Sequence, residues 1–212
     1  AVISKCNLYT TLKAGTEILR LRLHPEKEGF LNAIELGAPP PQFAKYANRM
    51  SAAGIPAFYG AFDKQTAIKE TAAENNIKSF ATIGKFRTFH DLVLVDFTKL
   101  PPTPSIFESN SSFIRHGLRF LRSFLSDFTS PIEKDGREHI EYVPTQIVAE
   151  YLRFIHQKDG NINIDGILYR SARQSDTSAC VLFINSDQSV DPGKENQMTT
   201  LVLTEVETFK LE

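Results

Sequence analysis

The 212-residue chain has little of several features that assign a protein to a class. Its two cysteines, Cys6 and Cys180, are too few for a disulfide scaffold or a thiolate zinc site, although the sequence allows a single disulfide between them. Its 24 Lys and Arg balance 25 Asp and Glu, without the cationic excess typical of proteins that bind a phosphate backbone. Generic nucleic-acid binding is therefore disfavoured, and a reducing, cytoplasmic location fits the cysteine content best.

Long apolar runs are also absent. No stretch approaches the ~20 residues that cross a bilayer, and the N-terminus lacks the basic-then-apolar pattern of a signal peptide. We therefore expect no membrane association. The length suits a single domain over residues 1–212. Ala1 stands where an initiator Met is expected, so the sequence is equally compatible with a fragment of a longer protein.

The common catalytic motifs are missing. The chain contains no GxxxxGK[ST], GxGxxG, HExxH or GxSxG segment, which removes several nucleotide-binding, metalloprotease and serine-hydrolase classes. The five histidines are scattered without a pair at metal-ligand spacing. We therefore expect no metal site.

The hydropathy pattern predicts an α+β fold, because strands stand at both ends of the chain around central helices. Helices are expected after a cap at Asp63 or Gln65, over 111–128, and from Pro144 to Ile155. The run 92–97 is almost continuously apolar and reads as a central strand. Strands are expected over 17–24, 57–62, 79–85, 92–97, 163–171, 179–185 and 199–211.

Two groups of arginines stand out. Alternation over 17–24 places Arg20 and Arg22 on one solvent-facing side of a strand. On the helix 111–128, Arg115, Arg119 and Arg122 form a stripe opposite the apolar face. The stripe could meet an acidic partner, but a solvated helix face is the favoured interpretation.

Several short segments together resemble a known family. An Arg-hydrophobic-Ser-x-x-Gly segment runs from Arg49 to Gly54, Tyr59 follows, and Thr66-Ala67 precedes Glu70. An arginine strand around Arg20 comes before them. After them come His139-Ile-Glu-Tyr142-Val-Pro-Thr-Gln146 and a late Ser171. In order and spacing these segments resemble the RES domain family, over roughly residues 17–186. Short members carry Gly-Arg-Trp where this chain has Asn48-Arg49-Met50, so any stacking by that Trp is lost.

The resemblance implies an ADP-ribosyltransferase-like fold, a mixed β-sheet core with flanking helices. It also implies an NAD pocket lined by an Arg, a Tyr and a Glu, and cleavage of the bond between nicotinamide and ribose. NAD is then a substrate, and no true cofactor is expected. Members of the family act as intracellular toxins beside Xre-type antitoxins, so an antitoxin or an inhibitory domain is the expected partner.

The chemistry of the residues agrees with this implication. An ordinary glycosidase needs two carboxylates, because the leaving oxygen must be protonated. NAD loses neutral nicotinamide, so one carboxylate suffices to balance the developing oxocarbenium charge. Glu70 is the candidate, although without the resemblance a solvated helix residue beside Lys69 would be the simpler interpretation. Tyr59 offers a ring face for nicotinamide, or is an ordinary core tyrosine.

The remaining candidates would bind or support the substrate. Arg20 and Arg49 carry guanidinium groups suited to the pyrophosphate, and Arg22 competes with Arg20 because both share a face. Ser171 would hold ribose or the catalytic Glu, or cap a turn. Tyr142 and Gln146 would brace the pocket or cap a helix rather than touch the reacting atoms.

Three functions remain open at this stage. The favoured one transfers ADP-ribose to water or phosphate. The second modifies a macromolecule, and is mildly disfavoured because Ile68, not an acid, stands two residues before Glu70, with Glu74 one turn after it. The third is a module that binds a nucleotide or a partner without turnover. A homo-oligomer is compatible with the sequence, which does not fix the oligomeric state.

Overall fold

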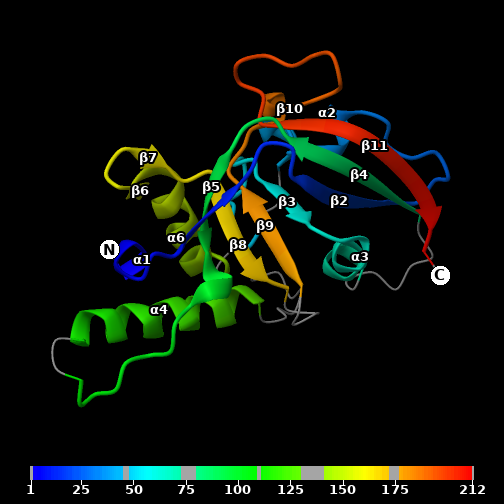
Figure 1. The fold of residues 1–212 in the computed structure, drawn as a ribbon. Coiled ribbons are helices and arrows are strands. Elements are labelled where there is room, and N and C mark those ends of the chain that lie inside the picture. The colour runs from blue at the N-terminus through cyan, green and yellow to red at the C-terminus, as the bar shows by residue number, and fades with distance from the viewer. Residues whose placement is uncertain are drawn as a thin grey trace.

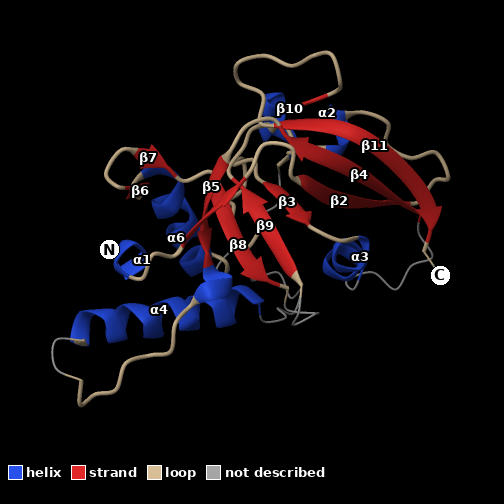
Figure 2. Ribbon diagram, viewed as in Figure 1, coloured by secondary structure: helices blue, strands red, loops and turns tan. Residues whose placement is uncertain are grey.

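A computed structural model of the chain describes residues 2–44, 48–72, 80–108, 111–129, 141–171 and 177–211. Within them a large mixed sheet is flanked by helices, as Figures 1 and 2 show, and the expected α+β class is confirmed. The helices are α1 (Val2–Lys5), α2 (Ala33–Leu36), α3 (Lys64–Ala72), α4 (Ser112–Thr129) and α6 (Val143–Phe154). The strands are β1 (Tyr9–Leu12), β2 (Glu17–His24), β3 (Phe58–Ala61), β4 (Phe80–Thr88), β5 (Leu92–Asp96), β6 (Gln157–Lys158), β7 (Ile162–Asn163), β8 (Gly166–Arg170), β9 (Ser178–Leu182), β10 (Ser189–Val190) and β11 (Leu201–Lys210).

The large sheet consists of two half-sheets that meet at one residue pair. Its order is β1-β5-β8-β9-β3-β2-β4-β11-β10, with β6 and β7 forming a separate hairpin. β2 pairs with β4 along its whole length, and β3 pairs with β9 along its whole length. Between β2 and β3, however, only Leu19 and Ala61 are paired. The sheet is therefore continuous, but β2 and β3 share only this pair, which lies at the last residue of β3.

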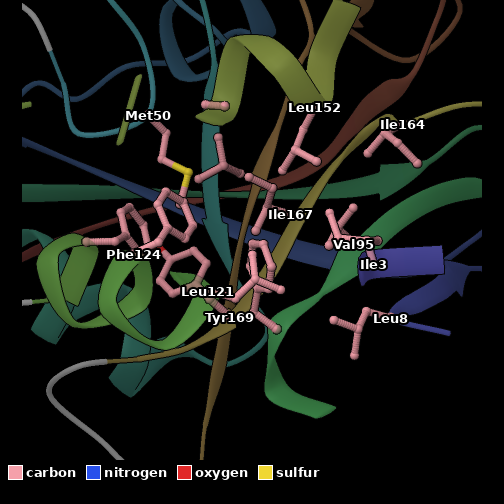
Figure 3. Packing of buried hydrophobic residues seen from close by; sticks show 14 of the residues in the cluster. Ile3, Leu8, Met50, Val95, Leu121, Phe124, Leu152, Ile164, Ile167 and Tyr169 are labelled. Carbon is pink, nitrogen blue, oxygen red and sulfur yellow. The ribbon is translucent and has the colours of Figure 1, made fainter. Parts of the chain in front are cut away.

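One face of the sheet carries helices on both half-sheets. Helices α1, α4 and α6 pack on the first half, where Leu121, Phe124 and Leu152 meet Ile167 and Tyr169 (Figure 3). Helix α3 packs on the junction, where Ala67 contacts a cluster with Leu21 and Ala61. The opposite face holds a second core of Ile18, Phe58, Phe86, Cys180 and Leu182, with Leu36 of α2.

Most expected elements are present, with shifts of a few residues at their ends. The helix cap expected at Asp63 or Gln65 is Asp63, whose Oδ1 accepts the Thr66 N–H at 2.8 Å. The strand expected over 163–171 is shorter, because Ile162–Asn163 turns back on β6 and the sheet strand begins only at Gly166. β5 is not central: it lies one place in from the edge strand β1.

The arginines of β2 and two of the three arginines of the α4 stripe are less free in solvent than the sequence predicts. The β2 face with Arg20 and Arg22 is not solvent-facing, because both are half-buried between Ile18 and His24, which are buried. On α4, Arg119 is exposed, whereas Arg115 donates to the Ser105 carbonyl at 3.2 Å and Arg122 donates to the Pro101 carbonyl. Two of the three stripe arginines thus hold the proline-rich segment that precedes α4.

Two further features bear on expectations from composition. Cys6 and Cys180 are both free, so the disulfide left open by the sequence is not formed. Among the described helices, none is long and apolar enough to cross a membrane.

Candidate functional site

Glu70 and Ser171 meet although 101 positions separate them in sequence. The Ser171 hydroxyl donates to Glu70 Oε1 at 2.5 Å. Glu70 is half-buried on α3, and Ser171 is buried immediately after β8. A half-buried carboxylate that accepts a hydrogen bond from a hydroxyl group is held in one orientation.

A second contact fixes α3 against the same strands. Thr66 lies one turn before Glu70, so both side chains point from one face of the helix. The Thr66 hydroxyl lies 2.7 Å from the Thr177 hydroxyl, and the Thr177 carbonyl accepts the Ser171 N–H at 2.9 Å. Thr66 and Glu70 therefore dock α3 onto the residues that join β8 to β9, and this docking sets the position of the Glu70 carboxylate.

Tyr59 reaches from β3 to the turn that contains Arg49. The N–H of Met50 donates to the Tyr59 hydroxyl at 3.3 Å, and Ser51 Oγ lies 3.4 Å from the same oxygen. Burial raises the pKa of Tyr59, while the hydrogen bonds of Ser51 and Met50 and the charge of Arg20 oppose that rise. Tyr59 is therefore a neutral phenol at physiological pH.

The first turn of α6 supports the turn over residues 48–51 from its other side. Gln146 Nε2 donates to the Asn48 carbonyl at 2.8 Å and to the Ser51 carbonyl at 3.3 Å, and the Thr145 hydroxyl donates to the Arg49 carbonyl. Gln146 thus touches the backbone of the turn. That it braces the site rather than contacts the reacting atoms stays a prediction.

Arg49 is joined to the C-terminal end of α4. Its Nη1 donates to the Phe128 carbonyl, and the Phe128 ring packs edge-on against the Tyr169 ring at 4.6 Å. The unpaired carbonyls at a helix C-terminus carry partial negative charge, so they favour a cation there. This contact commits part of the Arg49 fork to the protein.

Tyr169 lies near Glu70 and Arg49 but was not predicted from the sequence as a site residue. It is buried on β8, opposite Ala179 of β9, on the same face as Tyr59. Burial, then the nearby charge of Glu70, raises the pKa of Tyr169 well above its usual value, while Arg49 opposes the rise. The available signal was spacing: Tyr169 precedes Ser171 by two positions, and alternate residues of a strand point to one side.

Near the junction of the two half-sheets, the side chains of Arg20 and Arg22 make different contacts. Arg20 lies with its guanidinium 5.1 Å from the centre of the Phe58 ring, and Nη1 donates to the Ala57 carbonyl at 3.5 Å. Burial, then the charge of Arg22, lowers the pKa of Arg20 to about 9. Arg22 turns toward α2, where Nη2 donates to the Gly37 carbonyl at 3.0 Å. Of the two, Arg20 is the one whose charge acts on Tyr59.

Tyr142 lies at the start of α6, half-buried, where it opposes loss of the Tyr59 proton. Its carbonyl accepts the Thr145 hydroxyl at 2.9 Å and the Gln146 N–H at 2.9 Å. His139 and Glu74, named in the sequence argument, lie outside the described residues. Within the described residues, no group of three or more His, Cys, Asp or Glu gathers closely enough to hold a metal ion.

The structure thus joins Ser171 to Glu70 and places Glu70, Arg49 and Tyr59 near Tyr169. Arg20 lies apart from this group, over the Phe58 ring on the opposite face of the sheet, although its charge acts on Tyr59. A carboxylate in a fixed orientation lies near the Tyr169 phenol, which the charge of Arg49 also reaches, and this suits a substrate with an anionic part and a centre that becomes positive.

Comparison with known proteins adds one finding. A family model described as RES domain matches residues 22–203. This range includes Arg22, Arg49, Tyr59, Glu70 and Ser171, and begins two residues after Arg20. Searches of curated proteins and of solved structures found no match for the chain.

Proposed function

The chain belongs to the RES domain family, and from this premise and the site geometry we propose that it is an enzyme that consumes NAD by breaking the bond between nicotinamide and ribose. The observation that carries the proposal is the hydrogen bond from Ser171 to Glu70 beside Tyr59 and Tyr169. The arrangement supplies one fixed carboxylate, which is what loss of a neutral leaving group requires.

In the proposed reaction, the bond between the ribose C1′ and the nicotinamide nitrogen breaks, and its electron pair leaves with nicotinamide. The pyridinium charge is thereby neutralised, so no acid has to protonate the leaving group. Positive charge then develops at C1′ and the ring oxygen, where Glu70 stabilises it. Water or phosphate adds to C1′, and a proton is released when water is the acceptor.

The other residues take binding and positioning roles. Arg20 and Arg49 bind the pyrophosphate, since the charge of Arg20 acts on Tyr59 and that of Arg49 acts on Tyr169. Arg22 is the weaker candidate because its Nη2 is committed to Gly37. Tyr59 packs against the nicotinamide ring. Ser171 orients Glu70, and Tyr142 and Gln146 maintain the start of α6, with Gln146 holding the turn that carries Arg49.

Two alternatives remain and are separated by one assay. Purified chain is incubated with NAD labelled in its adenylate part. Free ADP-ribose beside released nicotinamide indicates hydrolysis, and a phosphorylated sugar product that requires phosphate indicates phosphorolysis. Label on protein indicates ADP-ribosylation of a macromolecule. Absence of nicotinamide release from folded protein would instead favour a binding module.

The biological proposal is that the enzyme acts as an intracellular toxin restrained by an antitoxin or inhibitory domain. Unrestrained cleavage of NAD would deplete the cell that carries the gene. Expression of this chain in a bacterium should therefore slow growth and lower cellular NAD, and Glu70→Gln should relieve both. Normal growth and unchanged NAD with well-expressed, folded chain would contradict the toxin proposal.

A further inference from the structure

The segment over residues 48–57 leads into β3, yet it belongs to no helix and to no strand of the sheet. An isolated bridge joins Asn48 to Ser51. Further along, the N–H of Ile55 donates to the Ala52 carbonyl at 3.0 Å. A segment of this kind keeps its shape through the groups that bind its backbone, because it has no ladder of its own.

Helix α6 supplies such groups at both ends of the segment. At the start of α6, the Thr145 hydroxyl and Gln146 Nε2 donate to carbonyls within residues 48–51. Two turns later, Arg153 Nη1 donates to the Pro56 carbonyl at 3.1 Å. The segment therefore runs along α6, with Arg153 holding the end from which β3 begins.

The Arg153 side chain is placed for this contact. It is half-buried, and the ring of Phe154 lies 5.2 Å from the carbon of its guanidinium group. Its Nη2 also donates to Asn185 Oδ1 at 3.4 Å. Burial lowers the pKa of Arg153, while the charge of Glu150 opposes the fall. Because Pro56 is buried, loss of this donor would leave a poorly solvated carbonyl without its partner.

The start of β3 needs such a hold. β3 pairs with β9 along its whole length, but with β2 only at Ala61, its last residue. Tyr59, near the other end of β3, is therefore held by the sheet on one side only. Its hydroxyl accepts the Met50 N–H at 3.3 Å, so the Tyr59 ring also depends on the shape of the segment over residues 48–57.

We propose that Arg153 is a positioning residue of the site, which holds the Pro56 carbonyl and thereby sets the place of the Tyr59 ring. This inference rests on the proposed function, in which Tyr59 packs against nicotinamide. Arg153 acts through the backbone and does not contact the substrate. It would thus add a second arginine role to the site, beside the arginines that bind the pyrophosphate.

The expected effect falls on binding rather than on turnover. Glu70 is held by Ser171, through a contact outside α6. Arg153→Met should therefore raise the KM for NAD about three- to tenfold, with kcat within about twofold of the unaltered chain. Arg153→Lys should recover part of the loss, because an ammonium group can reach the Pro56 carbonyl but lacks the fork that also reaches Asn185.

The first test is a double-mutant cycle with Tyr59→Leu, which removes the ring. If Arg153 acts by placing that ring, Arg153→Met should change the KM less than about twofold in the Tyr59→Leu background. Arg119→Met, at an exposed arginine of α4, is the matched control and should leave the KM unchanged. An equal effect of Arg153→Met in both backgrounds, or an equal effect of Arg119→Met, would overturn the proposal.

The second test does not depend on activity. Amide hydrogen exchange is compared between the unaltered chain and Arg153→Met, both folded. The N–H groups of Gly54 and Ile55, which donate to the Ala44 and Ala52 carbonyls, should exchange at least about threefold faster in the variant. Unchanged exchange there would overturn the proposal. Faster exchange in a chain that releases no nicotinamide would contradict the proposed function and still support the hold of Arg153 on this segment.

Discussion

The two half-sheets carry opposite charges near their junction, on opposite faces of the sheet. From β2 come Arg20 and Arg22, two half-buried cations whose pKa values are lowered by burial. The Nε of Arg22 is buried and has no hydrogen-bond partner among the described residues. From the other half-sheet and α3 come Glu70 and Ser171, which are joined by a short hydrogen bond.

This difference suggests that the β2 side of the proposed site binds the substrate and the α3 side takes part in the reaction. The β2 side carries positive charge that the protein only partly compensates, which costs stability and suits an anionic ligand. The α3 side is held together by internal hydrogen bonds, which suits a group that must keep its orientation during a reaction. Substitutions on the two sides should therefore have different kinetic signatures.

The largest expected effect comes from the α3 side. Glu70→Gln should lower kcat for nicotinamide release by at least about 100-fold with NAD binding retained, because its charge matters most when the oxocarbenium develops. Glu108→Gln, at an exposed position outside the site, is the control. Turnover of Glu70→Gln near that of the unaltered chain would contradict the role of Glu70.

A substitution on the β2 side should separate binding from stability. Arg20→Met should raise the KM for NAD by about 10-fold or more, the size typical of a lost charge-assisted contact. It should also stabilise the fold by about 1 kcal/mol, because it removes a half-buried charge that has no carboxylate partner among the described residues. Arg22→Met is the comparison. Steady-state kinetics and thermal unfolding of both variants show which arginine binds the substrate. A larger change of KM in Arg22→Met than in Arg20→Met would reverse our assignment.

The same arginine predicts a pH dependence. In the folded chain the pKa of Arg20 is about 9, so its charge is complete well below pH 9 and is lost as the pH rises through 9. The KM for NAD should therefore rise above about pH 9 in the unaltered chain and not in Arg20→Met. Because the pKa of an ordinary arginine is 12.5, the unfolded chain holds more protons between these values, and Arg20 makes stability increase with pH there. Unfolding of both proteins across this range measures that contribution.

The local sequence patterns predicted most helices and strands correctly, but they did not predict the contacts between those helices and strands. The alternation in 17–24 gave β2, and the polar start of 63–72 gave α3 with its cap at Asp63, because both signals are local. The burial of Arg20 and Arg22 was missed, since it depends on Phe58, Gly37 and α2, which are remote in sequence. The split between β2 and β3 was also invisible, because register between strands is a tertiary property.

The candidate site shows the same limit. The family resemblance placed Glu70, Tyr59 and Ser171, but the residues alone left a solvated Glu as the simpler interpretation. The contact between Ser171 and Glu70 requires α3 to dock on the end of β8, and no spacing in the sequence encodes that. Tyr169 was missed because a tyrosine in an apolar strand reads as core, which it also is.

The smallest expected effect concerns Tyr169, which lies near Glu70 and Arg49. Its phenol stays neutral, so it lies near Glu70 without adding a charge. Tyr169→Phe keeps the ring that packs against Phe128 and removes only the hydroxyl. We expect a three- to tenfold fall in kcat, about 1 kcal/mol in transition-state energy, with the KM for NAD unchanged, because the hydroxyl lies near the Glu70 carboxylate and we do not expect it to bind the anion. A change confined to KM would instead indicate that Tyr169 binds the substrate. The same conclusion would follow if Tyr169→Phe changed the affinity for NAD in a Glu70→Gln background, where binding is measured without turnover.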